Sequence, residues 1–149
     1  MGIKRFALAC AIALLASGCA SGPKFAEVKS AIPTQKANEG RVYVYRNSSF
    51  GAAVQPNVMV NDRPAGESQA MGFFFVDLPP GPVKVATSTE TEHQLTFKLD
   101  AGQVRYVRTD VHFGLFVGRI QPQLIDNAVG AKEIEECSYT GTPLTAAKK

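Results

Sequence analysis

Asp110 and His112 stand two positions apart in a stretch of alternating side chains, so both are expected on one face of a β-strand. A carboxylate and an imidazole could bind a metal ion there or, with a serine such as Ser48, form a hydrolytic triad. Two ligands do not complete a metal site, and no serine lies in a G-x-S-x-G motif. The chain also lacks the G-x-x-x-x-G-K-[ST] loop that binds phosphate. We therefore expect no catalytic residues, no metal and no cofactor.

Cysteine is the second reactive residue type, and the chain has three. A catalytic thiol needs a histidine and an orienting group beside it, and nothing in the sequence joins His93 or His112 to Cys137. In an oxidising compartment an unpaired cysteine either pairs with another chain or stays buried. We expect Cys137 to be buried and inert.

Cys19 ends a distinct pattern. Lys4 and Arg5 precede an uncharged apolar stretch over residues 6–16, which is shorter than the roughly 20 residues of a membrane-spanning helix and is typical of a signal peptide. The stretch closes with LASGC, which resembles a bacterial lipobox. This resemblance implies that residues 1–18 are a lipoprotein signal peptide and that the Cys19 thiol is lipidated, with acyl chains such as palmitate. A plain secretory signal with a chance cysteine and an uncleaved anchor are the alternatives.

The lipobox resemblance also implies a place in the cell. Ala20, rather than aspartate, follows the cysteine, which by similarity to enterobacterial sorting favours the outer membrane, with the domain facing the periplasm. Without Lys4 and Arg5, the mature chain has 14 basic side chains against 13 acidic ones. It has no basic patch interleaved with aromatic residues, so nucleic acid is not expected as a partner.

Local patterns predict one domain between a tether and a tail. Residues 19–40 read as a flexible tether, or as a short helix through Phe25, Val28 and Ile32 that Pro33 ends. From residue 41 the period changes to two, typical of short strands separated by turns. The expected strands cover residues 41–46, 57–61, 63–66, 72–77, 82–89, 93–99, 104–111 and 118–125. Asp126 is a candidate N-cap for a short helix over residues 127–136. These elements predict an all-β sandwich over residues 41–137 and a disordered tail over residues 138–149.

Several of these segments together resemble a known family. The segments are CASGPKF, RVYVYRNSSFGAAVQP, GFFFVDLPPG, STETEHQLTF, AGQVRYVRTDV and VGRIQPQLI. They are similar to an uncharacterised bacterial lipoprotein family, the domain of unknown function 2846. Residues 58–87 are also similar to the PEGA type of surface β-domain. The resemblance implies an immunoglobulin-like or PEGA-like β-sandwich in the cell envelope, and it assigns no catalytic residue.

Two loops differ from ordinary loops because they are apolar and contain glycine: residues 48–54 and residues 112–118. If both are exposed, they form a patch of the kind that marks an interaction site. The candidate interaction residues are Phe50, Phe113, Leu115, Phe116 and Arg119. Arg119 and Arg46 flank the loops and could border the patch or pair with Asp110. Alternatively, the loops fold inward and close one end of the sandwich.

We therefore expect a non-catalytic, outer-membrane-anchored lipoprotein that binds an envelope protein or glycan through this end. A cell-envelope hydrolase using Asp110, His112 and Ser48 is the second hypothesis. A carrier of a small apolar ligand, with its pocket between the sheets, is the third.

Overall fold

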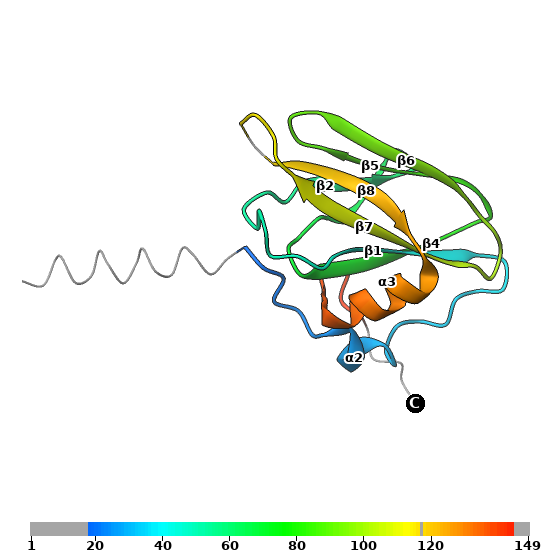
Figure 1. Cartoon of the computed structure of the whole chain (residues 1–149). Coiled ribbons are helices and arrows are strands. Elements are labelled where there is room, and N and C mark those ends of the chain that lie inside the picture. The colour runs from blue at the N-terminus through cyan, green and yellow to red at the C-terminus, as the bar shows by residue number, and fades with distance from the viewer. Residues whose placement is uncertain (1–17, 117, 145–149) are drawn as a thin grey trace, which may run out of the picture.

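The computed structural model describes residues 18–116 and 118–144. Apart from Gly18, the expected signal peptide lies outside the described residues, as does the end of the tail. The described chain forms two packed β-sheets with short helices on one side (Figure 1). One sheet has the order β8-β7-β1-β4-β9 and the other the order β3-β2-β5-β6. This confirms the all-β sandwich with a short C-terminal helix.

The strands follow the sequence periodicity closely. They are β1 (Gly40–Arg46), β2 (Asn57–Val60), β3 (Arg63–Glu67), β4 (Gly72–Leu78), β5 (Gly81–Ser88), β6 (Glu92–Leu99), β7 (Val104–His112), β8 (Arg119–Ile125) and β9 (Ser138–Tyr139). Within residues 18–116 and 118–144, three helical segments accompany them: α2 (Phe25–Val28), α3 (Asn127–Glu133) and the 3₁₀ helix η2 (Ile134–Glu136). Asp126 accepts a hydrogen bond from the Ala128 N–H, which confirms it as the N-cap of α3.

β1 lies at the centre of the five-stranded sheet and separates two apolar clusters. It pairs antiparallel with β4 and parallel with β7. Because strand side chains alternate, Val42 and Val44 point into the space between the sheets while Tyr43 and Tyr45 point to the outer face. The inner cluster joins aliphatic side chains of both sheets, whereas the outer one is aromatic and is covered by the helices (Figure 1).

The segment expected to be a flexible tether is instead packed against this outer face, which corrects that expectation. Phe25 of α2 makes edge-to-face contacts with Tyr43 and Phe73, at ring-centroid distances of 6.0 and 5.3 Å. Val28 and Ile32 pack against the same cluster. The short-helix alternative was therefore the better one. Partial burial of these three side chains on an aromatic sheet face stabilises a segment that is too short to be helical alone.

The expected disordered tail also begins as ordered structure. Ser138 and Tyr139 form β9, which pairs parallel with β4, and the Tyr139 ring stacks on Phe75. The Tyr139 N–H donates to the Pro23 carbonyl, and the Phe25 N–H donates to the Cys137 carbonyl. The first and last described segments thus pair with each other beside the sheet.

Candidate functional site

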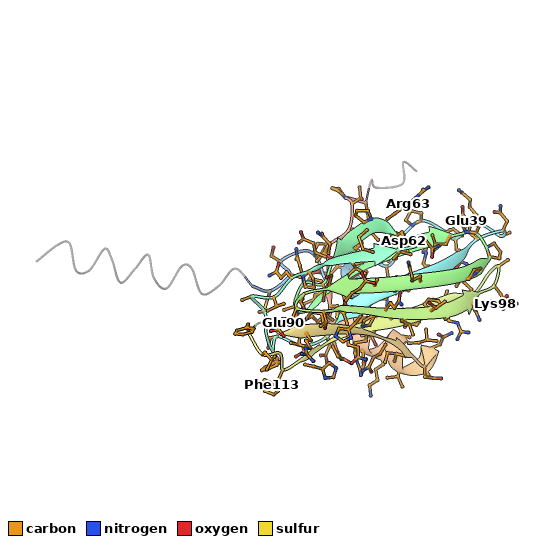
Figure 2. The ribbon with its side chains drawn as sticks, turned by 90° about the horizontal axis from the view of Figure 1, so that it is seen from above. Glu39, Asp62, Arg63, Glu90, Lys98 and Phe113 are labelled. Carbon is orange, nitrogen blue, oxygen red and sulfur yellow. The ribbon has the colours of Figure 1, made fainter. Side chains whose placement is uncertain are left out.

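One end of the sandwich collects the features that the sequence analysis singled out. Arg46, the last residue of β1, pairs with Gly72, the first of β4, and β7 runs parallel to β1. The loops after β1, before β4 and after β7 therefore meet at one end, together with the β5–β6 turn that holds Glu90 (Figure 2). We call this the Cys19 end, defined by Cys19 and residues 47–56, 68–71, 89–91 and 113–116.

Four large apolar side chains are exposed at the Cys19 end. The relative exposures are 52% for Phe50, 89% for Phe113, 81% for Leu115 and 95% for Phe116. Phe50 and Phe113 come from different loops, and their rings meet edge to face at 5.5 Å. The loops therefore do not fold inward at these positions. We call these four side chains the apolar patch. A hollow of about 250 Å³ lies between the two loops, lined by Val54, Val111 and patch residues.

Glu90 holds the second loop in place from the neighbouring turn. Its carboxylate accepts hydrogen bonds from the backbone N–H groups of Leu115 at 3.0 Å and Phe116 at 2.5 Å. The Arg119 Nε lies 3.6 Å from the same carboxylate. Arg119 therefore borders the patch as an ion-pair partner of Glu90 and is not paired with Asp110.

Arg46 has a different role from the one expected. It is 1% exposed, so it does not border the patch, and Asp110 accepts its hydrogen bonds from Arg108. Its guanidinium donates to four carbonyl oxygens: Phe50 at 2.6 Å, Gly51 and Val54 at 2.8 Å, and Ser68 at 3.1 Å. Burial lowers its pKa from the usual range. A long side chain at the end of a buried strand thus ties two loops together beneath the patch, because its planar group offers several donors at once.

Cys19 is exposed and lies against the loop that carries Phe50. The Ala20 N–H donates to the Ala70 carbonyl at 2.8 Å, which pairs the chain with the segment before β4. Gln55 Nε2 donates to the Gly18 carbonyl at 2.9 Å. A Cβ on Gly18 would stand only 2.8 Å from the Ala52 Cβ. The residue expected to carry lipid is thus fixed at the same end as the patch.

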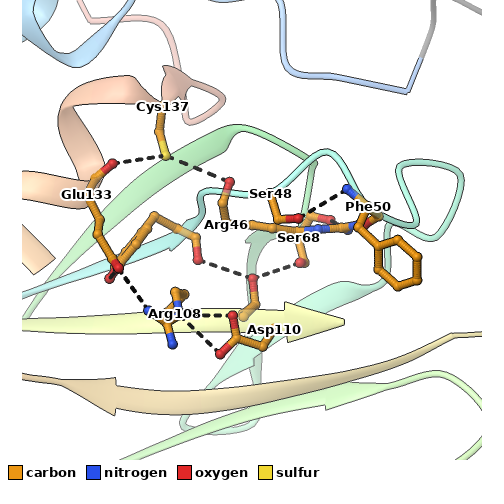
Figure 3. Close-up of polar contacts among 10 residues, drawn as sticks. Arg46, Ser48, Phe50, Ser68, Arg108, Asp110, Glu133 and Cys137 are labelled. Atoms are coloured by element: carbon orange, nitrogen blue, oxygen red, sulfur yellow. Dashed lines mark hydrogen bonds and ion pairs between the residues drawn. The ribbon is translucent and has the colours of Figure 1, made fainter. Parts of the chain in front are cut away.

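The hydrolase candidates are engaged in other contacts or are separate (Figure 3). The Asp110 carboxylate accepts from Arg108 Nε at 2.9 and 3.1 Å. Arg108 also donates to Glu133, which accepts a 2.5 Å hydrogen bond from the Tyr45 hydroxyl. Ser48 Oγ accepts from the Phe50 N–H and forms a local turn. In the described part of the chain, no hydrogen bond joins Asp110, His112 and Ser48.

Comparison with known proteins places this structure in a family. The model of a family of proteins of unknown function, DUF2846, matches residues 36–119. The chain belongs to the DUF2846 family. An uncharacterized protein of Haemophilus influenzae is 30% identical over 131 residues, which is 84% of this chain and 77% of that protein. The family match covers β1 to β7 and every residue of the apolar patch.

Two further properties of the DUF2846 chain concern metals and membranes. Among the described residues, no three histidine, cysteine, aspartate or glutamate side chains lie close enough together to hold a metal ion. Within the same residues, no helix is both long and apolar enough to cross a membrane.

Cys137 is buried, as expected. Its Sγ lies 3.7 Å from the Arg46 carbonyl and 3.9 Å from the Glu133 carbonyl. Burial raises the pKa of this thiol from 9.0 to about 12, so the folded protein holds it protonated at neutral and mildly alkaline pH. The thiolate is the nucleophilic form, and it is therefore scarce at this site.

We expect Cys137 of the folded protein to resist alkylation by iodoacetamide at pH 8 and to react once the chain is unfolded in urea. The unfolded thiol titrates near its ordinary pKa, so both exposure and thiolate content rise on unfolding. Mass spectrometry of the peptide that contains Cys137, in a Cys19→Ala variant, reports this thiol separately from Cys10. Rapid labelling of the native variant, at the rate seen in urea, would show that the thiol is accessible.

Two important residues of the site were not found from the sequence. No local pattern marks Glu90, because the loop that it contacts, residues 113–116, lies more than 20 positions further along the chain. Arg46 was interpreted as a surface charge. Its position directly after Val42, Val44 and Tyr45, in a strand apolar on both faces, was the available signal that it is buried.

Proposed function

We propose that this DUF2846 protein is a lipid-anchored, non-catalytic component of the bacterial cell envelope. In this proposal Cys19 carries the acyl chains, the outer membrane holds them, and the domain lies in the periplasm. The domain acts by binding an envelope component through the apolar patch. The observation that carries the proposal is the presence of an exposed Cys19 and four exposed apolar side chains at one end of the sandwich.

The contacts of the candidate residues support binding rather than catalysis. Asp110 is neutralised by Arg108, and the Ser48 hydroxyl caps its own loop. A general base has to reach the proton that it removes, and His112 is bonded to neither residue in the described chain. In the described chain the space between the sheets holds a packed cluster of buried side chains, mostly valines with Phe74 and Leu99. Both observations favour a domain that works through its surface.

The anchor is tested by labelling cells with an alkyne-bearing palmitate and replacing Cys19 by alanine. We expect the wild-type protein to carry the label and to sediment with outer membranes. The Cys19→Ala variant should lose the label completely, because the thioether has no other sulfur at the cleavage site. One acyl chain binds a membrane only marginally, while several chains bind it stably, so the share of the protein in the outer-membrane fraction should change from nearly all to nearly none.

The Cys137→Ala variant is the matched control, since it removes a cysteine of the same domain and should keep both label and membrane. A labelled Cys19→Ala variant, or an unlabelled wild-type protein, would contradict the anchor. Label with sedimentation in inner membranes would contradict only the outer-membrane assignment.

A further inference from the structure

We propose that the apolar patch is a membrane-contact surface, and that Phe113, Leu115 and Phe116 insert into the lipid leaflet that holds the acyl chains of Cys19. The occupant of the patch is therefore the bilayer itself. This inference rests on the proposed lipid anchor and deepens it by naming the envelope component that the patch binds. The domain then stands end-on against the membrane with its opposite end in the periplasm.

The first step is the absence of a free linker in the described chain between Cys19 and the domain. The Ala20 N–H is bonded to Ala70, Lys24 bridges to Ser138, and α2 packs on the sheet. Acyl chains on Cys19 can reach the hydrocarbon region only if Cys19 lies within the headgroup layer, which is a few ångströms thick on each side of the bilayer. The residues beside Cys19 must then lie at the membrane surface too.

The second step is the position of the patch relative to Cys19. Gly18 contacts Ala52 in the first loop, and Phe50 of that loop contacts Phe113 of the second. A Cβ on Gly118 would lie 3.7 Å from a methyl group of Val54, so the two loops are also close at their bases. The patch is thus continuous with the attachment point. A leaflet that takes up the acyl chains of Cys19 meets the patch at the same time.

The third step is the difference in chemistry between the two ends of the sandwich. At the Cys19 end, exposed phenylalanine and leucine side chains project, and the Glu90 carboxylate beneath them is engaged by two N–H groups and Arg119. The opposite end carries the charged side chains of Glu39 and Lys98 (Figure 2). Apolar side chains at a lipid interface and charged side chains in water are the favourable arrangement.

These steps favour lipid over a protein or glycan as the occupant. A stable protein interface needs about 800 Å² on each partner. A protein partner would have to find this area at the end of the domain that the membrane holding Cys19 already occupies. The patch carries no cluster of basic side chains, so insertion depends on apolar contact and not on anionic headgroups. Uncharged phosphatidylcholine vesicles are therefore sufficient as the probe.

The test uses the fact that the chain contains no tryptophan. Phe116→Trp introduces a single indole into the full lipidated protein at a position that is 95% exposed. The protein is reconstituted into phosphatidylcholine vesicles with and without nitroxide-labelled lipid. We expect the emission of this variant to shift to shorter wavelengths on vesicles and to be largely lost with nitroxide lipid. Lys98→Trp, at the opposite end, is the matched control and should keep water-like, unquenched emission.

Flotation of the vesicles separates the two proposals. Protein that floats with its indole at position 116 unquenched overturns the contact surface and leaves the anchor intact. Protein that does not float overturns the anchor and, with it, the contact surface. A photoreactive residue at position 116 tests the same surface in cells. We expect crosslinks to phospholipid, and a discrete crosslinked protein or glycan band would overturn the lipid assignment.

Discussion

Replacing Arg46 by methionine is expected to lower the free energy of unfolding by about 3–5 kcal/mol. Each hydrogen bond from a charged donor contributes about 1.5–3 kcal/mol, and burial of the guanidinium offsets part of the sum of four. Methionine keeps much of the apolar stem but leaves the carbonyls of Phe50, Gly51, Val54 and Ser68 without this donor. Native domains are stable by about 5–15 kcal/mol, so the loss is a large fraction of the total. Urea unfolding followed by circular dichroism measures it.

The stabilities of two further variants show whether the lost hydrogen bonds cause the destabilisation. Arg46→Lys keeps the charge but has only three donors on one nitrogen, so it should recover less than half of the loss. Arg63→Met removes an exposed arginine from the edge strand β3 and should change stability by about 0.5 kcal/mol or less. If Arg46→Met stayed within about 1 kcal/mol of the wild type, the four hydrogen bonds would not hold the loops in the way described.

Replacing Gly130 by alanine is expected to destabilise the protein by about 2 kcal/mol, although alanine is the better helix former. Helix propensity alone favours alanine by about 1 kcal/mol. Packing opposes it, because a Cβ at this position would stand 2.4 Å from both Cβ and Cγ of Tyr106. Those atoms are next to the backbone of β7, so α3 itself must move away, and overpacking of this kind costs about 1–3 kcal/mol or more. The shift in thermal midpoint measures the net effect.

Ala131→Gly on the exposed face of the same helix isolates the propensity effect. It should cost about 1 kcal/mol without any steric change. A Gly130→Ala variant that is more stable than the wild type would mean that α3 does not pack against Tyr106 at this distance.

Local sequence patterns were sufficient to predict the β-sandwich. Alternation in β1 placed Val42 and Val44 opposite Tyr43 and Tyr45, and both faces are buried as that pattern requires. Pro79 and Pro80 precede Gly81, where φ is +147°, and the chain turns there from β4 into β5. These elements depend on short-range chemistry, which a sequence displays directly. The sequence did not decide whether the patch is exposed, because apolar loops can equally fold inward and close one end of a sandwich.

The errors concern contacts between distant segments. Residues 19–40 are polar enough to suggest a tether. The segment nevertheless contains three apolar side chains, Phe25, Val28 and Ile32, that pack on the aromatic face of the five-stranded sheet. An aromatic residue on the outward face of a strand needs a cover, and Tyr43 and Tyr45 therefore pointed to a second layer. Nothing local identified which segments supply it. For the same reason Arg46 was expected at the surface, and Glu90 was not recognised as part of the site.

The pairing of the first and last described segments also determines when, during synthesis of the chain, the domain can finish folding. Pro23 and Phe25 exchange backbone hydrogen bonds with Tyr139 and Cys137, and β9 completes the edge of the sheet beside β4. However early β1 and β4 pair in a growing chain, Phe73 therefore stays only partly covered until residues 137–139 emerge. Closure is a late event that joins the oldest part of the polypeptide to the newest. A stop codon shortly before Cys137 would leave an open aromatic sheet, not a slightly shorter domain.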